Sequence, residues 1–439
     1  MKIKSIDLFA GIGGTRLGFE QACKSLNINH ECVLTSEVKS YALEVLKDNF
    51  SHKKIVGDIT KIDSEEIPDF DILFAGFPCQ PFSSGGKRLG FSDTRGTLFF
   101  DIERILEAKK PHSFLLENVE GMVRHDLKNK HDKIGNTLNT ILDILENKLN
   151  YNVSWKVINS LDFGVPQQRK RIYILGSKNS KIKIDQPEYI QSKLSSVLQE
   201  GLPSYNSFFV EKLLKQYKIE DLYGKQIKDT RGGPNNIHTW DFELRGPCSS
   251  DEKLLLNTLF KERRKKHWAK EIGIAWQDGM PLTKDQISTF FKRRNLQSML
   301  DNLVNNGYLN YIHPKDLVTI ETKNGFEKVR KFALDKPKGY SIVAGKLNLE
   351  INNILSPEGF APTLVATDMH KLFVPDKGKL RKISYREGLR MFGYPDSFKM
   401  PLSKESQVYD LLGNTIVVPV VNYLSQLLIE DMVKSHFLR

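Results

Sequence analysis

The segment Asp7-Leu8-Phe9-Ala10-Gly11-Ile12-Gly13-Gly14 predicts an apolar strand that enters a glycine-rich turn and continues into a helix. We expect the strand over residues 3–9 and the helix over residues 15–26. Glycines let a ligand approach the backbone, and a helix N-terminus favours the polar or anionic end of that ligand. The glycine spacing differs from the G-x-G-x-x-G dinucleotide fingerprint, so it argues against a redox cofactor and an oxidoreductase.

Short apolar strands continue to alternate with amphipathic segments as far as about residue 180. Further strands are expected at 31–37, 54–58, 71–75, 113–116, 154–159 and 171–175, and further helices at 40–49, 98–108 and 133–149. This alternation predicts an α/β fold built on a doubly wound, mostly parallel sheet.

The charge of the chain points to a polyanionic partner. The 439 residues carry a formal net charge of +12, and residues 201–358 hold 26 Lys+Arg against 19 Asp+Glu. More than half of the positive excess therefore lies in about a third of the chain, which makes nucleic acid the expected partner.

The cysteines and the apolar runs indicate a cytoplasmic protein. Cys23, Cys32, Cys79 and Cys248 lack Cys-x-x-Cys spacing, so we expect neither a metal site nor a disulfide framework. The N-terminus is expected to enter a strand at once, without a signal peptide. No apolar run is expected to reach the roughly 18 residues that cross a bilayer.

After residue 176 the alternation breaks, and polar, basic segments with scattered aromatics predict a second domain. Residues 251–314 are more organised, with helices expected at 252–272, 283–291 and 295–305 before an apolar β-pair at 307–311. This order suggests a winged helix-turn-helix, and a plain helical insertion is the alternative. From residue 384 to the end the compact α/β pattern returns.

Cys79 follows the apolar strand at 71–75 and lies between Pro78 and Pro81. Prolines remove backbone donors and fix φ, so the loop is stiff and presents the thiol at the end of a buried strand. A free cysteine that fills a gap in the core is the alternative. We interpret Cys79 as a nucleophile.

Several polar residues stand at the ends of other expected strands. Glu37 is placed to accept bonds from ribose hydroxyls, Asp58 to bond an exocyclic amine, and Glu117 to donate a proton from a half-buried carboxyl. Arg169 and Arg171 share one face of a strand, where they can hold a phosphate or a base oxygen. Solvated acids and a solvated basic edge are the alternatives.

In this order, the motifs resemble those of the cytosine-5 DNA methyltransferase family, of the bacterial restriction–modification type. The match takes in residues 7–14, Glu37, 57–59, 76–83, 95–101, 117–119, 167–171, 386–387, 392–398 and 413–415. It covers about 1–178 and 359–439. The resemblance implies a Rossmann-like S-adenosylmethionine-dependent methyltransferase fold with a catalytic domain (1–178), an inserted target-recognition domain (179–383) and a C-terminal segment that returns to the catalytic domain (384–439).

The resemblance also implies a mechanism, in which the target is a cytosine flipped out of double-stranded DNA. Cys79 would attack C6 of the base, and Glu117 would protonate or hydrogen-bond N3. Arg171 would contact the base oxygen, with Arg169 supporting it or holding a phosphate. Covalent attack makes C5 nucleophilic, so that it takes the methyl group.

For the cofactor S-adenosyl-L-methionine, the resemblance implies a pocket shared by both ends of the chain. Phe9 would pack on the adenine, Glu37 would bind the ribose, and Asp58 with Ile59 would flank the adenine. The remaining residues implied in this pocket are Gly11, Ile12, Gly13, Pro78, Leu98, Asn414 and Thr415.

For DNA, the resemblance implies an active-site loop at 83–91 that closes on the substrate. The residues implied to contact DNA in or beside this loop are Gln80, Ser83, Lys87 and Arg95. Thr363 matches a position that lies near the backbone of the target DNA in this family. In the middle region, we expect Arg293 and Arg294, beside Lys292, to contact phosphate, and Asn295 and Gln297 to contact base edges.

Two other functions fit the sequence less well. An RNA methyltransferase is disfavoured because the transfer-RNA branch of the family lacks a long recognition domain, and a non-enzymatic regulator because Cys79, Glu117, Arg169 and Arg171 are all present. We expect a monomer in the cytoplasm, associated with the nucleoid, and a cognate restriction endonuclease as a genetic rather than a physical partner.

Overall fold

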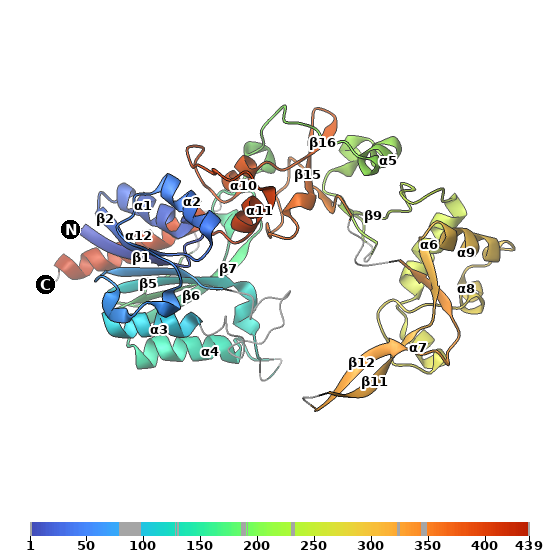
Figure 1. Ribbon diagram of the computed structural model, residues 1–439, viewed down its shortest axis with the longest axis horizontal. Helices are drawn as coiled ribbons and strands as arrows, with labels where there is room; N and C mark the ends of the chain where they lie inside the picture. Colours follow the sequence, from blue (N-terminus) through green and yellow to red (C-terminus); the bar gives the residue numbers. More distant parts are fainter. Residues whose placement is uncertain are drawn as a thin grey trace. The chain divides into compact units, whose positions relative to one another are not determined.

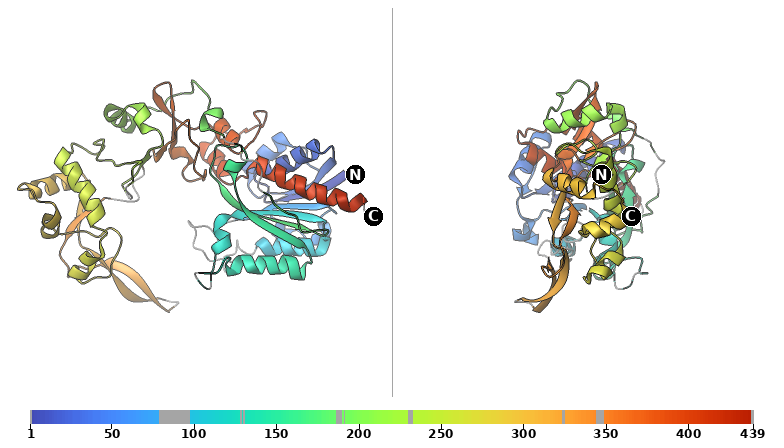
Figure 2. Two further views of the ribbon diagram at one scale, coloured as in Figure 1. Left: turned by 180° about the vertical axis from the view of Figure 1, so that it is seen from behind. Right: turned by 90° about the vertical axis from the view of Figure 1, so that its right-hand side faces the viewer.

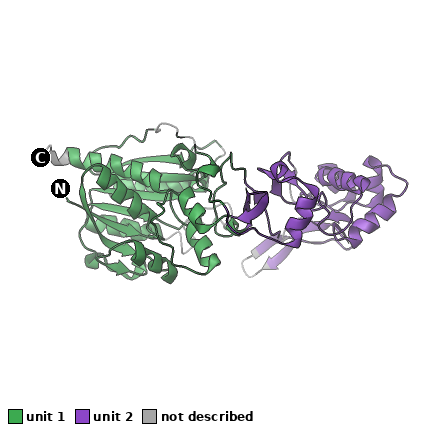
Figure 3. Cartoon of the chain, turned by 90° about the horizontal axis from the view of Figure 1, so that it is seen from above, with its two compact units in different colours: residues 1–200, 356–370, 383–439 green, residues 201–355, 371–382 purple. Residues whose placement is uncertain are grey.

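The computed structural model describes residues 2–78, 98–127, 129, 131–185, 190, 192–229, 233–322, 325–343 and 349–437. The chain divides into two units, drawn in separate colours in Figure 3. Unit 1 comprises Met1–Glu200, Ser356–His370 and Ile383–Arg439, and unit 2 comprises Gly201–Leu355 and Lys371–Lys382.

Seven described strands form the sheet of unit 1, in the order β3-β2-β1-β4-β5-β7-β6. The first five in this order are parallel, whereas β7 runs antiparallel to both β5 and β6. The prediction of a doubly wound, mostly parallel sheet is confirmed. The strands are β1 Lys2–Leu8, β2 Asn29–Ser36, β3 Ile55–Val56, β4 Ile72–Gly76, β5 Ser113–Val119, β6 Asn152–Asn159 and β7 Lys170–Ser177.

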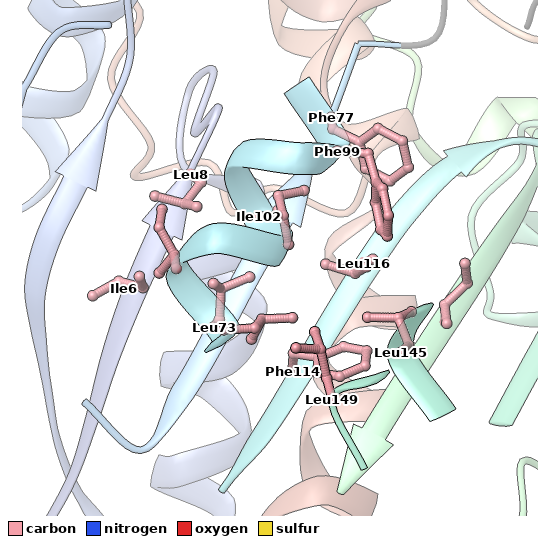
Figure 4. Close-up of a cluster of buried hydrophobic side chains, with 14 of the residues drawn as sticks. Ile6, Leu8, Leu73, Phe77, Phe99, Ile102, Phe114, Leu116, Leu145 and Leu149 are labelled. Atoms are coloured by element: carbon pink, nitrogen blue, oxygen red, sulfur yellow. The ribbon is translucent and has the colours of Figure 1, made fainter. Parts of the chain in front are cut away.

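Helices cover both faces of this sheet (Figure 1). Successive side chains of a strand point to opposite faces of the sheet, so each strand buries one set of side chains against the helices on each face. The cluster in Figure 4 joins Leu73, Phe114 and Leu116 of the sheet to Ile102 of α3 on one face. The helices of unit 1 are α1 Gly14–Ser25, α2 Ser40–Asn49, α3 Leu98–Lys109, α4 Asn136–Asp143, α10 Tyr385–Met391, α11 Glu405–Gly413 and α12 Val418–Phe437.

The C-terminal helix α12 corrects one expectation. Among the described residues, Glu405–Lys434 is long and apolar enough to cross a membrane by length and composition alone. However, 61% of the apolar 18-residue stretch within it is buried inside the protein, and α12 lies beside α1 in Figure 1. Val421, Leu424 and Leu428 are buried there, as in the core helix of a folded domain.

The boundary between the two units also differs from the one expected at residue 179. Residues 179–200 belong to unit 1 because their backbone bonds to its other segments. The amide of Leu194 donates to the carbonyl of Gly359 at 2.8 Å, and the amide of Gln199 donates to Glu387 Oε1 at 2.7 Å. The segment Ser356–His370 joins unit 1 for the same reason.

Unit 2 contains a five-stranded sheet, in the order β16-β15-β14-β8-β9, and a separate group of helices and hairpins among its described residues. The strands are β8 Gln226–Ile227, β9 Asn236–Ile237, β10 Leu309–Ile312, β11 Lys315–Thr322, β12 Gly325–Phe332, β13 Gly339–Ile342, β14 Asn353–Ile354, β15 Leu372–Asp376 and β16 Lys379–Lys382. The helices are α5 Phe208–Gln216, α6 Ser250–Glu262, α7 Lys266–Ile272, α8 Lys284–Phe290 and α9 Leu296–Asn305.

The long helix expected at 252–272 is instead two helices, α6 and α7, that separate at Arg263. Arg263, Arg264, Lys265 and Lys266 form a run of like charges, which weakens a continuous helix. The break buries Arg263, whose pKa is lowered to about 10, mainly by burial. It also lets Trp268 of α7 join the same apolar cluster as the residues of α6.

Candidate active site

A cavity of about 380 Å³ lies at the carboxyl ends of β1, β2, β4 and β5. Ligands of open α/β sheets bind at this edge. The lining joins many of the predicted residues to neighbours that the sequence did not single out. It consists of Phe9, Gly11, Ser36, Glu37, Val38, Lys39, Asp58, Ile59, Gly76, Phe77, Pro78, Leu98, Glu117, Val119, Arg169, Arg171, Asp410, Leu411, Gly413 and Asn414.

The turn after β1 forms one wall of this cavity. Phe9 has φ of 57°, a left-handed conformation that is uncommon for a residue with a side chain and that clusters at ligand sites. Gly13 has φ of 81°, and a Cβ atom there would lie 2.5 Å from Phe50 Cε2. Position 13 therefore requires glycine, and α1 begins at the next residue.

Glu37 connects this turn to the end of β2. Its Oε2 accepts a hydrogen bond from the amide of Gly11 at 2.7 Å. Its Oε1 accepts bonds from the amides of Val38 and Lys39, each at 2.8 Å. A carboxylate has about four acceptor positions, so Glu37 retains capacity to accept a further bond from a ligand.

The other predicted cofactor residues divide into two groups. Asp58 lines the cavity and caps the short helix Ile59–Lys61 by accepting a bond from the amide of Thr60 at 3.1 Å. Of the described residues with this prediction, Ile12, Gly13 and Thr415 lie outside the lining. Ile12 is buried, and Thr415 Oγ1 lies 2.6 Å from the hydroxyl of Tyr394.

A polar cluster around Asp410 of α11 was not predicted from the sequence. Its Oδ2 accepts bonds from Lys39 Nζ at 2.5 Å and from the hydroxyl of Tyr41 at 2.7 Å. Its Oδ1 accepts a bond from Asn414 Nδ2 at 3.0 Å. The cluster holds the C-terminal part of the chain against the residues that follow β2. Its one signal in the sequence was a carboxylate four residues before Asn414.

Glu117 and Arg171 meet at the antiparallel pair of β5 and β7. Arg171 Nε lies 3.1 Å from Glu117 Oε1, and both side chains are 14% exposed. Gly76 of β4 is opposite Glu117 in register and leaves the carboxyl group open to the cavity. A carboxyl group and a planar guanidinium side by side can bind a ligand that presents adjacent donor and acceptor atoms.

Arg169, which was expected to support Arg171 or to hold a phosphate, lines the cavity and also binds other segments of unit 1. It is buried, and its guanidinium donates to the carbonyls of Leu364 at 3.1 Å, Gly413 at 3.3 Å and Thr415 at 3.0 Å. Arginine offers five donors in a fixed plane, which suits it to join three carbonyls. Arg169 therefore positions the C-terminal segment at the cavity.

Cys79 lies outside the described residues, but the approach to it is described. Phe77 and Pro78 line the cavity after β4, and Asn118 Nδ2 donates to the carbonyl of Phe77 at 3.3 Å. The three described cysteines, Cys23, Cys32 and Cys248, are buried. Burial raises the pKa of each, to about 12 for Cys23 and Cys248. Each is thus a poor thiolate at neutral pH.

Only some of the residues expected to contact DNA are described. Gln80, Ser83, Lys87 and Arg95 lie outside the described residues. Thr363 belongs to unit 1, where its hydroxyl donates to the carbonyl of Gln168 at 2.7 Å. The other four, Arg293, Arg294, Asn295 and Gln297, are exposed at the turn before α9 and in its first turn.

Two of these four already have partners within unit 2. Arg293 Nη2 lies 3.2 Å from Asp251 Oδ1. Gln297 Nε2 donates to Asp301 Oδ1 at 2.8 Å and to the hydroxyl of Tyr340 at 3.0 Å. Contact with a base edge would require Gln297 to exchange these bonds.

Asp7 gives a testable pH dependence. Burial raises the pKa of its carboxyl to about 7 from 3.8, although Thr15 Oγ1 donates to it at 2.7 Å and Arg16 also lowers the pKa. The folded state therefore holds this proton where the unfolded chain has lost it, so the contribution of Asp7 to stability falls as pH rises from about 4 to about 7. The free energy of unfolding of the Asp7→Asn variant, relative to that of the unsubstituted protein, is therefore expected to rise by about 2 to 3 kcal/mol as the pH goes from about 5 to about 8. Urea unfolding of both proteins at both pH values measures this change. The same difference in free energy of unfolding at the two pH values would contradict the prediction.

Comparison with known proteins places this site in context. The family model of C-5 cytosine-specific DNA methylases matches residues 3–430. The chain is 56% identical over 431 residues to Type II methyltransferase M.NlaIV of Neisseria lactamica, covering 98% of this chain and 100% of that protein. It is 38% identical over 462 residues to Type II methyltransferase M.BanI of Aneurinibacillus aneurinilyticus, covering 100% of this chain and 98% of the other.

Among solved structures, the methyltransferase EhMeth of Entamoeba histolytica superposes with a TM-score of 0.52 at 16% sequence identity. The alignment covers 98% of this chain and 99% of that one. At this identity the likeness concerns the fold alone.

Proposed function

The chain belongs to the C-5 cytosine-specific DNA methylase family, and from this premise we propose that the cavity in unit 1 is its active site. The protein is a DNA (cytosine-5-)-methyltransferase that uses S-adenosylmethionine. The observation that carries the assignment of the site is the Glu117–Arg171 pair, which shares one cavity with Glu37, Phe9 and Pro78.

The cavity residues fit S-adenosylmethionine, which supplies an electrophilic methyl group when bound. Glu37 retains acceptor capacity for ribose hydroxyls beside the glycine turn. Phe9, Ile59 and Leu98 offer apolar surface to an adenine ring, and Asp58 offers a carboxylate to its amine. Arg169 and Asp410 keep the C-terminal residues 413–415 beside this pocket.

The proposed chemistry uses Cys79, Glu117 and Arg171. A cytosine must leave the duplex before its ring can be reached. The Cys79 thiolate forms a bond to C6, while Glu117 protonates or hydrogen-bonds N3 and Arg171 holds the base oxygen. The electron pair displaced toward C5 would form the bond to the methyl group, whose bond to the cofactor sulfur would break and leave its electron pair on that sulfur. Loss of the C5 proton and expulsion of the thiolate then restore the aromatic ring.

Glu37 gives a direct test of the cofactor site. Replacing Glu37 with Gln removes the charge and one acceptor oxygen from a buried carboxylate, so we expect the Kd for S-adenosylmethionine to rise about 10- to 100-fold. Isothermal calorimetry measures the Kd, and thermal unfolding without cofactor checks the fold. Glu44→Gln, on the exposed side of α2, is the control. An unchanged Kd in Glu37→Gln would remove Glu37 from the cofactor site.

Unit 2 is proposed as the target-recognition domain, and α8 with α9 as a helix-turn-helix. Supporting this, β10 pairs with β13, and Leu282, just before α8, forms an isolated bridge to Tyr340 of β13, so two short strands and one bridged residue flank the two helices. The hairpin β11–β12 lies between β10 and β13 in the chain, where a wing occurs. Residues 251–343 hold 18 Lys+Arg against 11 Asp+Glu, and this positive net charge suits binding to DNA.

The biological setting is also a proposal. The relatives named Type II methyltransferases support a role in which methylation protects DNA from a cognate restriction endonuclease encoded by a separate gene. We propose that the protein acts as a monomer in the cytoplasm, at the nucleoid that holds its substrate. Transfer of labelled methyl groups to plasmid DNA, and not to transfer RNA, is the expected result. Labelling of transfer RNA alone would overturn the DNA assignment.

A further inference from the structure

Most of the described side chains on the hairpin of β11 and β12 are exposed. Eight register pairs join the two strands, from Lys315↔Phe332 to Thr322↔Gly325. Figures 1 and 2 show it extending beyond the helices of unit 2. Large apolar side chains on it are exposed, Phe326 at 78% and Phe332 at 51%. A two-stranded hairpin is only marginally stable by itself, so this one is suited to bind a partner.

The hairpin is anchored at its base to the loop that follows α7. Arg330 donates from Nη1 to the carbonyl of Ala275 at 3.0 Å and from Nη2 to that of Trp276 at 2.7 Å. Asp316 Oδ1 accepts a bond from the amide of Ala275 at 2.7 Å. These bonds fix the direction in which the hairpin leaves the helices and leave the rest of its surface exposed.

The two faces of the hairpin differ in charge. Because side chains alternate and paired residues share a face, one face carries Lys315, Lys328 and Arg330 against a single acid, Glu321. We call it the basic face, and it also presents Leu317, Thr319, Phe326 and Phe332. The opposite face carries Lys331 against Asp316 and Glu327. Only the basic face has the sign that attracts a polyanion.

Resting on the proposed function, we propose that the β11–β12 hairpin is a DNA arm whose basic face lies along a groove of the substrate duplex. A two-stranded ribbon fits the major groove of B-DNA. Eight residues of strand span about 26 Å, longer than the groove is wide. Lys315 and Lys328 then contact phosphates, and Thr319, directly opposite Lys328, faces the bases.

Lys328 and Lys331 make a matched test, since both are exposed on β12 and point to opposite faces. Fluorescence anisotropy with a labelled duplex cut from a plasmid gives the Kd over a series of KCl concentrations. Lys328→Gln is expected to weaken binding and to reduce the slope of log K against log salt by about 0.9. The double variant, Lys315→Gln with Lys328→Gln, is expected to reduce this slope by about 1.8. Lys331→Gln is expected to keep the original slope. Unchanged thermal unfolding and cofactor affinity confirm that each variant is folded.

Equal slopes of log K against log salt for Lys328→Gln and Lys331→Gln would overturn the proposal that the hairpin is a DNA arm. A change in sedimentation without a change in slope would identify a second copy as the partner of the hairpin and would also overturn it. Methyl transfer to the plasmid by the unsubstituted protein separates the two proposals. If it transfers no methyl group to DNA, the proposed function fails. If the unsubstituted protein methylates DNA and the Lys328→Gln variant keeps the original slope, only the proposal of a DNA arm fails.

Discussion

Replacing Cys79 with serine is expected to reduce methyl transfer to DNA by a factor of about 1,000 or more, because an alcohol is a far weaker nucleophile than a thiolate. Cofactor affinity and DNA affinity are expected to stay within error of those of the unsubstituted protein, since the oxygen replaces the sulfur at the same position. Transfer of labelled methyl groups to plasmid DNA measures the activity, and calorimetry measures cofactor binding.

The control for this variant is Cys248→Ala. Cys248 is buried in the apolar cluster of unit 2, and burial raises the pKa of its thiol to about 12. It is therefore expected to contribute nothing to the reaction, and Cys248→Ala should retain methyl transfer. Ordinary turnover by Cys79→Ser would exclude Cys79 as the nucleophile and with it the proposed mechanism.

Replacing Glu117 with Gln is expected to lower the rate of methyl transfer about 100- to 10,000-fold, the range that a single general acid contributes. Glutamine keeps the size of the side chain but cannot give a proton to N3, so negative charge accumulates on the ring when Cys79 attacks. The variant also replaces the acidic side chain that lies 3.1 Å from Arg171 Nε.

Adduct formation separates this effect from a loss of binding. DNA synthesised with 5-fluorocytosine traps the covalent complex, because the fluorine cannot leave C5 as a proton does. Glu117→Gln is expected to form the denaturation-resistant complex slowly, with unchanged cofactor affinity. Glu120→Gln, which is exposed just after β5, is the control and should trap at the original rate. Equal trapping rates for the two variants would show that Glu117 gives no assistance.

Much of unit 1 is predictable from local sequence. The helix expected at 40–49 is found as Ser40–Asn49, and the strand expected at 154–159 is found as Asn152–Asn159. Apolar periodicity and glycine turns determine these elements, because each depends on residues close in the chain. Residues at the ends of parallel strands also converge as expected, which brings Phe9, Glu37 and Glu117 to one cavity.

The parts that sequence reasoning missed depend on contacts between distant residues. Arg169 lines the cavity as Arg171 does, but its bonds to the carbonyls of Gly413 and Thr415 form only after the C-terminal segment has folded back. Asp410 finds Lys39 and Tyr41 only after the chain has folded back. The break between α6 and α7 buries Arg263 beside Phe260 of the apolar cluster of unit 2, a contact that helix propensity does not reveal.

Bisulfite sequencing tests the central claim most directly. Plasmid DNA incubated with the protein and S-adenosylmethionine is predicted to contain protected cytosines within one short recurring sequence, and DNA incubated with the Cys79→Ser variant is predicted to contain none. The same measurement reveals the recognised sequence and the methylated position. Absence of any protected cytosine, while the protein still binds the cofactor, would contradict the account of this chain as a DNA cytosine-5 methyltransferase.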